Sequence, residues 1–290
     1  MRSLAPFLFA LALSTAGAHA LTPAEIVAAA PQSAWTDIPP EDLLVMDFGD
    51  GKRLVIQLAP DFSQAHVANI RRLAAAHWWD DTSIYRVQDN YVVQWGDRTE
   101  KKPLPADAAK TLPEDYSIVR KTVKGRVIPV PSRDSYAPTT GFLDGWPVAM
   151  NAEALWPVHC YGMVGAGRNL APDAGNGAEL YAVIGHAPRH LDRNIALVGR
   201  VIEGMENFSS LPRGTETLGM YAPAQTAIPI RSVRLASEIP GETRPHFQML
   251  DTHSKTFADY AHARENRQDE FFNVPAGGAD ICNIPVPIRR

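Results

Sequence analysis

Short apolar and alternating runs recur along the chain from residue 43 onward. The runs at 43–47 and 53–58 are rich in Leu, Val and Ile, and Gly49-Asp50-Gly51 lies between them. Asp-Gly between two such runs is typical of a two-stranded hairpin. Six further segments have strand character, at residues 83–87, 91–95, 162–165, 180–184, 196–201 and 228–235. This succession of short strands predicts a mainly β protein built as an antiparallel barrel or sandwich.

Helical spacing of apolar residues is confined to a few segments. In residues 63–76, Val67 and Ile70 fall on one apolar face, and Ser63 or Asp61 can cap the first turn. Three further helices are expected, at residues 23–30, 205–211 and 254–268. We expect the last of them to pack against the barrel.

Residues 98–147 lose the regular pattern. They contain seven prolines and carry nine basic and six acidic side chains. Because proline removes a backbone donor, we expect a long loop insertion here. Within it, residues 127–131 have the composition of a polyproline-like spacer or an edge strand. The chain thus divides into a lead-in at 21–40, a main domain at 41–240 that contains the insertion, and a C-terminal extension at 241–290.

The first twenty residues have the pattern of an export signal. Arg2 precedes an apolar stretch that ends in Ala18-His19-Ala20, so we expect a signal peptide at 1–20 that is cleaved after Ala20. The alternative is an uncleaved membrane anchor, but residues 14–20 are too weakly apolar to complete a span of about 30 Å. No later window is apolar enough to cross a bilayer. The sequence therefore predicts a periplasmic or secreted protein with no membrane span after cleavage.

Cys160 and Cys282 are the only cysteines, and they lie 122 positions apart. In an oxidising compartment an even pair indicates a disulfide, which would fasten the C-terminal extension to the core. Two buried free thiols are the alternative.

Composition and charge exclude several classes of protein. The chain is 45% apolar and 21% charged with a net charge of −4, which is typical of a folded protein and lacks the basic surface that nucleic-acid binding requires. The nine histidines show no metal-ligand spacing, and no Gly-x-Ser-x-Gly or His-Glu-x-x-His motif is present. After Gly165-Ala166-Gly167, Leu170 replaces the third glycine of a dinucleotide loop. We expect no metal, no cofactor and no nucleic-acid partner.

Residues 84–97 resemble the signature of the cyclophilin family, a Phe-His-Arg-Val strand followed by Gly-Phe-Met-x-Gln-Gly-Gly-Asp. Arg86, Gln94, Gly96 and Asp97 match it directly. Other blocks follow in the family's order at compatible spacing, at residues 56–60, 67–70, 79–82, 162–168, 176–181, 191–192 and 198–205. The resemblance implies a closed eight-stranded antiparallel barrel capped by two helices, with peptidyl-prolyl cis-trans isomerase activity.

The resemblance also implies the site residues. Rotation about an X-Pro bond needs no nucleophile, metal or cofactor, only a pocket for the proline ring and donors that favour the twisted amide. Arg86 is the expected catalytic donor, and Gln94 is expected to bond the substrate backbone. Four residues align with the family's apolar proline pocket: Tyr91, Val92, Tyr181 and Leu191.

Several positions depart from the family pattern. Tyr91, Val92 and Tyr181 replace larger or purely apolar side chains, so a wetter pocket is expected. Glu179 replaces a Gln, which makes the site more acidic, and His190 stands where many relatives carry Trp. A polar residue of the family is replaced by Ile195, which predicts weak activity.

The expected partners are unfolded, proline-containing polypeptides, bound by a monomer. A non-catalytic chaperone-like module that binds such segments is the alternative function.

Overall fold

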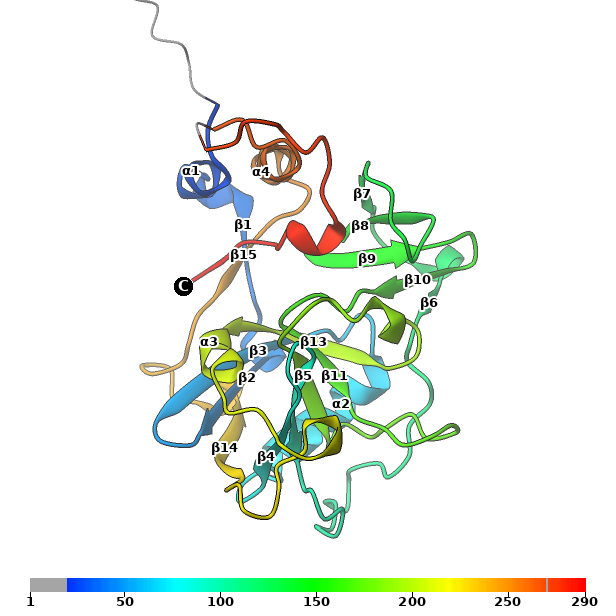
Figure 1. Ribbon diagram of the computed structural model, residues 1–290, viewed down its shortest axis with the longest axis vertical. Coiled ribbons are helices and arrows are strands. Elements are labelled where there is room, and N and C mark those ends of the chain that lie inside the picture. The colour runs from blue at the N-terminus through cyan, green and yellow to red at the C-terminus, as the bar shows by residue number, and fades with distance from the viewer. Residues whose placement is uncertain (1–19, 270) are drawn as a thin grey trace, which may run out of the picture.

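Eight antiparallel strands close into a barrel in the computed structural model, which describes residues 20–269 and 271–290 (Figure 1). The strands are β2 (Leu43–Phe48), β3 (Lys52–Leu58), β4 (Ser83–Val87), β5 (Val92–Gly96), β11 (Met163–Ala166), β12 (Leu180–Val183), β13 (Leu197–Glu203) and β14 (Ile228–Leu235). Their order around the barrel is β11-β12-β5-β4-β14-β2-β3-β13. The predicted barrel is therefore confirmed. The predicted signal peptide falls, except for Ala20, outside the described residues.

Two helices share the core of the barrel, as expected. They are α2 (Gln64–Ala75) and α3 (Met205–Ser209). Val67, Ile70 and Phe208 are buried among the inward-facing strand residues. The side chain of Ser63 does not cap α2; instead Asp115, about 50 positions downstream, accepts hydrogen bonds from backbone amides of the first turn.

A second sheet forms where loops were expected. It consists of β6 (Ile118–Val119), β7 (Ile128–Val130), β8 (Thr139–Leu143), β9 (Trp146–Met150) and β10 (Ala154–Pro157), in the order β6-β10-β9-β8-β7. The expectation of loops throughout 98–147 is wrong from residue 118 onward. The prolines that suggested loops lie largely outside these strands or at the sheet edge, and β7, with Pro129, is the edge strand foreseen as one possibility for 127–131.

The N-terminal lead-in and the C-terminal extension meet in a third sheet. Its strands are β1 (Trp35–Asp37), β15 (Gln248–Leu250) and β16 (Ile288–Arg289), in the order β1-β15-β16. The helices α1 (Pro23–Ala28) and α4 (Lys255–Glu265) lie together beside it (Figure 1). The predicted helices at 23–30, 205–211 and 254–268 are thus present, each ending two or three residues early.

The expected packing of α4 against the barrel is wrong. Phe257 and Tyr260 of α4 are buried in a second core formed mainly by β8, β9 and β10, and the rings of Phe142 and Phe257 lie 4.9 Å apart. This second core also contains Met163 and Leu197 of the barrel. The second sheet therefore rests on the β11–β13 side of the barrel, whereas Met249 and Ile288 of the third sheet pack against Val45 and Val55 of β2 and β3.

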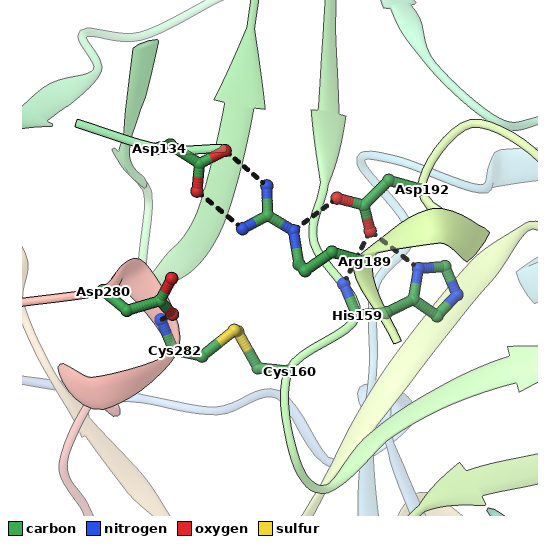
Figure 2. Close-up of a disulfide and its surroundings, with 7 residues drawn as sticks. All are labelled: Asp134, His159, Cys160, Arg189, Asp192, Asp280 and Cys282. Atoms are coloured by element: carbon green, nitrogen blue, oxygen red, sulfur yellow. Dashed lines mark hydrogen bonds and ion pairs between the residues drawn. A yellow bond between two sulfur atoms is a disulfide. The ribbon is translucent and has the colours of Figure 1, made fainter. Parts of the chain in front are cut away.

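Cys160 and Cys282 form the predicted disulfide, with their Cα atoms 5.2 Å apart (Figure 2). The alternative of two free thiols is excluded. The bond joins the segment after β10 to the C-terminal extension. Among the helices of residues 20–269 and 271–290, none has the length and apolarity needed to cross a membrane.

Candidate active site

A β-bulge brings two adjacent side chains of β4 onto the same residue of β5. Arg86 pairs with Gln94, and the register shifts between Ile84 and Arg86, which leaves Tyr85 as the extra residue. Regular alternation would point Tyr85 and Arg86 to opposite faces, but a bulge redirects a side chain. Arg86 Nη1 donates to Gln94 Oε1 at 2.9 Å, and Gln94 Nε2 donates to the Tyr85 hydroxyl at 2.8 Å.

The guanidinium of Arg86 is fixed but carries no counter-charge. Its Nε donates to the carbonyl of Leu218 at 2.7 Å, and its Nη2 donates to Gln88 Oε1 at 2.6 Å. Within residues 20–269 and 271–290, no carboxylate forms an ion pair with it. Burial lowers the pKa of Arg86 below its ordinary value. A cation held in this way can direct its field and its remaining protons at a bound amide.

An apolar cluster lies next to Arg86. Val92 and Tyr181 are buried there, and the predicted pocket residues Tyr91 and Leu191 are partly buried against them. The ring of Tyr91 is 5.9 Å from the Arg86 guanidinium carbon. The structure thus brings together all four apolar pocket residues named from the sequence, and Ile195 completes the cluster.

His190 lies at the edge of this cluster. It is exposed, and its ring stacks on Tyr91 with 6.2 Å between centroids and 10° between planes. A flat imidazole therefore stands at the position where many relatives carry the larger indole.

The hydroxyl of Tyr181 does not open into the pocket. It lies 3.0 Å from Nε2 of the buried His159, whose Nδ1 is 3.0 Å from Asp192 Oδ1. Burial raises the pKa of Tyr181 well above its ordinary value, so the phenol stays neutral. The expectation that Tyr181 makes the pocket wetter is wrong, because the hydroxyl is bonded inside the protein.

A buried ionic network supports this contact from the second sheet's side (Figure 2). Arg189 donates to Asp192 through Nε at 2.6 Å and to Asp134 through Nη1 at 2.8 Å. Arg189 begins the short helical turn Arg189–Leu191, in which His190 stacks on Tyr91 and Leu191 packs against the apolar cluster. Asp134 lies in the insertion, so the insertion is connected through these charges to Tyr181 of that cluster.

Glu179 lies on the other side of Gln94. Its Oε1 accepts from the backbone amide of Asp97 at 2.7 Å, and its Oε2 accepts from the Tyr85 hydroxyl. Burial raises the pKa of Glu179 to about 7. Tyr85, Gln94 and Glu179 line a cleft of about 310 Å³, whose lining includes no residue of the apolar cluster. Glu179 is therefore not part of that cluster.

Among the described residues, no cluster of three or more His, Cys, Asp or Glu side chains is arranged to hold a metal ion. The groups available in the site are a guanidinium, an amide, a phenol and a carboxyl group.

The comparison with protein families decides the identity. The model of the cyclophilin type peptidyl-prolyl cis-trans isomerase/CLD family matches residues 43–235. The chain belongs to this family. The matched range is the segment that folds into the barrel, and the sequence-based recognition is confirmed.

A solved structure shows the same fold. The crystal structure of the cyclophilin AquaCyp293 from Hirschia baltica superposes with a TM-score of 0.69 at 21% identity, over 88% of this chain and 92% of that chain. A cyclophilin type isomerase from Cryptosporidium parvum gives 0.42 at 13% identity, over 67% of this chain and 96% of that one. No curated protein sequence matches the chain.

Sequence reasoning missed three parts of this cyclophilin site. Tyr85 gave no signal because nothing in the sequence marks the bulge. His159 had only its position beside Cys160 to distinguish it, and the carbonyl of Leu218 could not be found from side-chain chemistry at all.

Proposed function

We propose that this cyclophilin catalyses the cis-trans isomerisation of X-Pro bonds in exported polypeptides. The observation that carries the proposal is the Arg86 guanidinium, fixed without a counter-charge beside the apolar cluster that contains Tyr91 and Leu191. The disulfide supports a place outside the cytoplasm, and the predicted signal peptide would direct the chain there. Unfolded segments that contain proline are the proposed substrates.

The proposed mechanism is non-covalent. Twisting the amide breaks its resonance, so the prolyl nitrogen regains a lone pair that can accept a hydrogen bond. Arg86 donates to this nitrogen and favours the twisted state, while Gln94 bonds the substrate backbone. The side chains of the apolar cluster contact the pyrrolidine ring and exclude water, which strengthens these interactions. Because the donors act on the twisted state more than on either planar state, they lower the barrier.

Magnetisation-exchange NMR on a short Ala-Pro peptide tests this function directly. We expect the wild-type protein to exchange the cis and trans signals, and Arg86→Ala to lower kcat/KM roughly 100-fold through loss of the donor. Arg231→Ala, which removes an exposed arginine of β14, is the matched control and should retain wild-type exchange.

The same variants separate catalysis from simple binding. If the wild-type protein suppresses aggregation of an unfolded client but exchanges no peptide, and Arg86→Ala leaves both unchanged, the protein is a non-catalytic binding module. Loss of exchange in Arg86→Ala with retained binding supports the enzyme.

A further inference from the structure

Three hydrogen bonds connect Glu179 to Arg86 through Tyr85 and Gln94, and a fourth joins Glu179 to the backbone amide of Asp97. From this chain of hydrogen bonds we propose that Glu179 is a positioning residue, whose ionised carboxylate fixes the orientation of Gln94 and thereby of the Arg86 guanidinium. The bonds run from Asp97 N and Tyr85 to Glu179, from Gln94 to Tyr85, and from Arg86 to Gln94. The proposal rests on the proposed function, because it assigns Arg86 to catalysis.

The direction of the chain follows from what each group can donate and accept. A guanidinium only donates, and an ionised carboxylate only accepts. Arg86 therefore requires Oε1 of Gln94, at 2.9 Å, which turns Gln94 Nε2 to the Tyr85 oxygen at 2.8 Å. The Tyr85 proton is then directed at Glu179. With Glu179 ionised, every group of the chain has a partner.

Protonation of Glu179 reverses the direction of donation along these hydrogen bonds. A neutral carboxyl group donates to Tyr85, so the Tyr85 proton turns toward Gln94. Gln94 must then present Oε1 to Tyr85, which places Nε2 against Arg86, donor against donor. Arg86 loses one of the acceptors that hold its plane, and its alignment with the substrate nitrogen is relaxed.

The local fold holds the carboxylate in place. Gly96 has φ +145°, and a Cβ there would lie 2.3 Å from Glu179 Oε1, so the strand leaves room for the carboxylate only because residue 96 is glycine. The backbone amide of Asp97 is aimed at Glu179 by a tight loop, in which the Asp97 carboxylate accepts from the amides of Thr99 and Lys102.

The pKa of Glu179 falls in a pH range in which activity can be measured. Burial is the main cause that raises its pKa to about 7, while the bonds from Tyr85 and Asp97 oppose the rise. Burial also raises the pKa of Tyr85, which therefore stays neutral across this range. The other charged side chains that line the same cleft are Asp97, Glu100, Lys102, Lys110, Arg168 and Asp173.

The test is the pH profile of kcat/KM between pH 5 and 9, measured by magnetisation exchange on a blocked Ala-Pro peptide without ionisable groups. We expect the wild-type rate to rise with pH around 7. Glu179→Gln, which keeps the shape but presents a donor to Tyr85, should lie about fivefold below the wild-type plateau, mainly in kcat, with a flat profile. Tyr85→Phe, which interrupts the chain, should also flatten the profile.

Two control variants isolate the effect. Glu100→Gln removes an exposed carboxylate of the same cleft, and His190→Gln removes a histidine at the edge of the apolar cluster, a residue type that titrates near this pH. Both should retain the wild-type rise. A rise that persists in Glu179→Gln, or that disappears in His190→Gln, overturns the proposal.

A second measurement does not depend on turnover. The side-chain amide signals of Gln94 and the Nε signal of Arg86, followed by ¹⁵N NMR without substrate, should shift with a common midpoint near pH 7 in the wild type but not in Glu179→Gln. Signals that do not move overturn the role of Glu179. If the signals move but the protein shows no turnover, the hydrogen-bond chain is supported and the proposed function is overturned. The catalytic role of these hydrogen bonds is then overturned as well.

Discussion

In this cyclophilin the role of a side chain depends on its surroundings rather than on its residue type alone. Tyr181 and Tyr85 both replace other residues of the family pattern. The hydroxyl of Tyr181 is turned inward to His159, whereas that of Tyr85 joins Gln94 to Glu179. Two phenols on strands that both pair with β5 therefore have different roles, because one meets the imidazole of His159 and the other meets a carboxylate.

The buried carboxyl group of Glu179 makes stability depend on pH. Its pKa is about 7 in the folded protein against an ordinary 4.5, so folding favours the protonated form. The folded state is thus most stabilised below pH 4.5, and this contribution is lost as the pH rises through 7. We expect Glu179→Gln to abolish this dependence, so that the wild-type free energy of unfolding falls by about 2–3 kcal/mol relative to the variant between pH 4.5 and 8.

Urea unfolding at pH 4.5, 6 and 8 measures this difference. Glu242→Gln, at an exposed position away from Glu179, should follow the wild-type curve. Parallel wild-type and Glu179→Gln curves would contradict the expectation.

At the scale of elements, the site depends on irregularities in regular structure. The bulge in β4 aligns Tyr85 and Arg86, and the turn Thr217–Gly219 brings the carbonyl of Leu218 to Arg86 Nε. This turn lies close to β4, because a Cβ on Gly219 would be 2.4 Å from the Cα of Gln88.

Gly219→Ala should therefore displace the turn. Gly219 has φ +74°, so alanine adds backbone strain to the steric contact. We expect kcat/KM to fall about tenfold because Arg86 loses its carbonyl acceptor. Peptide exchange measures the change. Gly241→Ala, where a Cβ would meet nothing within 4 Å, is the matched control and should behave as the wild type.

At the scale of elements, the structure also shows which strands the sequence patterns could not predict. Alternation and helical spacing predicted the eight barrel strands and the four helices, since both patterns are local properties of a segment. They missed β8 and β9, whose mostly buried residues do not alternate, because these strands are covered by α4 from more than 100 positions downstream. β1 was missed as well, because its partner β15 lies in the C-terminal extension.

At the scale of the whole molecule, the disulfide and the second core join the added regions to the barrel. Cys160 follows His159 directly, so the covalent link to the C-terminal extension begins beside the support of Tyr181 (Figure 2). The ion pairs of Arg189 with Asp134 and Asp192 lie in the same neighbourhood.

We expect the paired substitution Cys160→Ser with Cys282→Ser to lower the free energy of unfolding by about 3–5 kcal/mol, because the bond closes a loop of 122 positions in the unfolded chain. Urea unfolding measures the loss, and the reduced wild-type protein should show a similar decrease. Equal unfolding midpoints for the oxidised wild type and the double variant would show that the bond adds no stability.

The sequence by itself determined the eight strands, the helices, the cysteine pair and the joint presence of Arg86 and Gln94, because periodicity and short motifs are written in neighbouring residues. The resemblance to the cyclophilin family, and not periodicity, selected the closed barrel over a sandwich. Only the tertiary structure decided the second sheet, the role of His159 and the position of Glu179. The contact between Tyr85 and Glu179 joins residues 94 positions apart and requires both a bulge and a strand register. Such contacts are fixed by how segments pack, and no single segment encodes them.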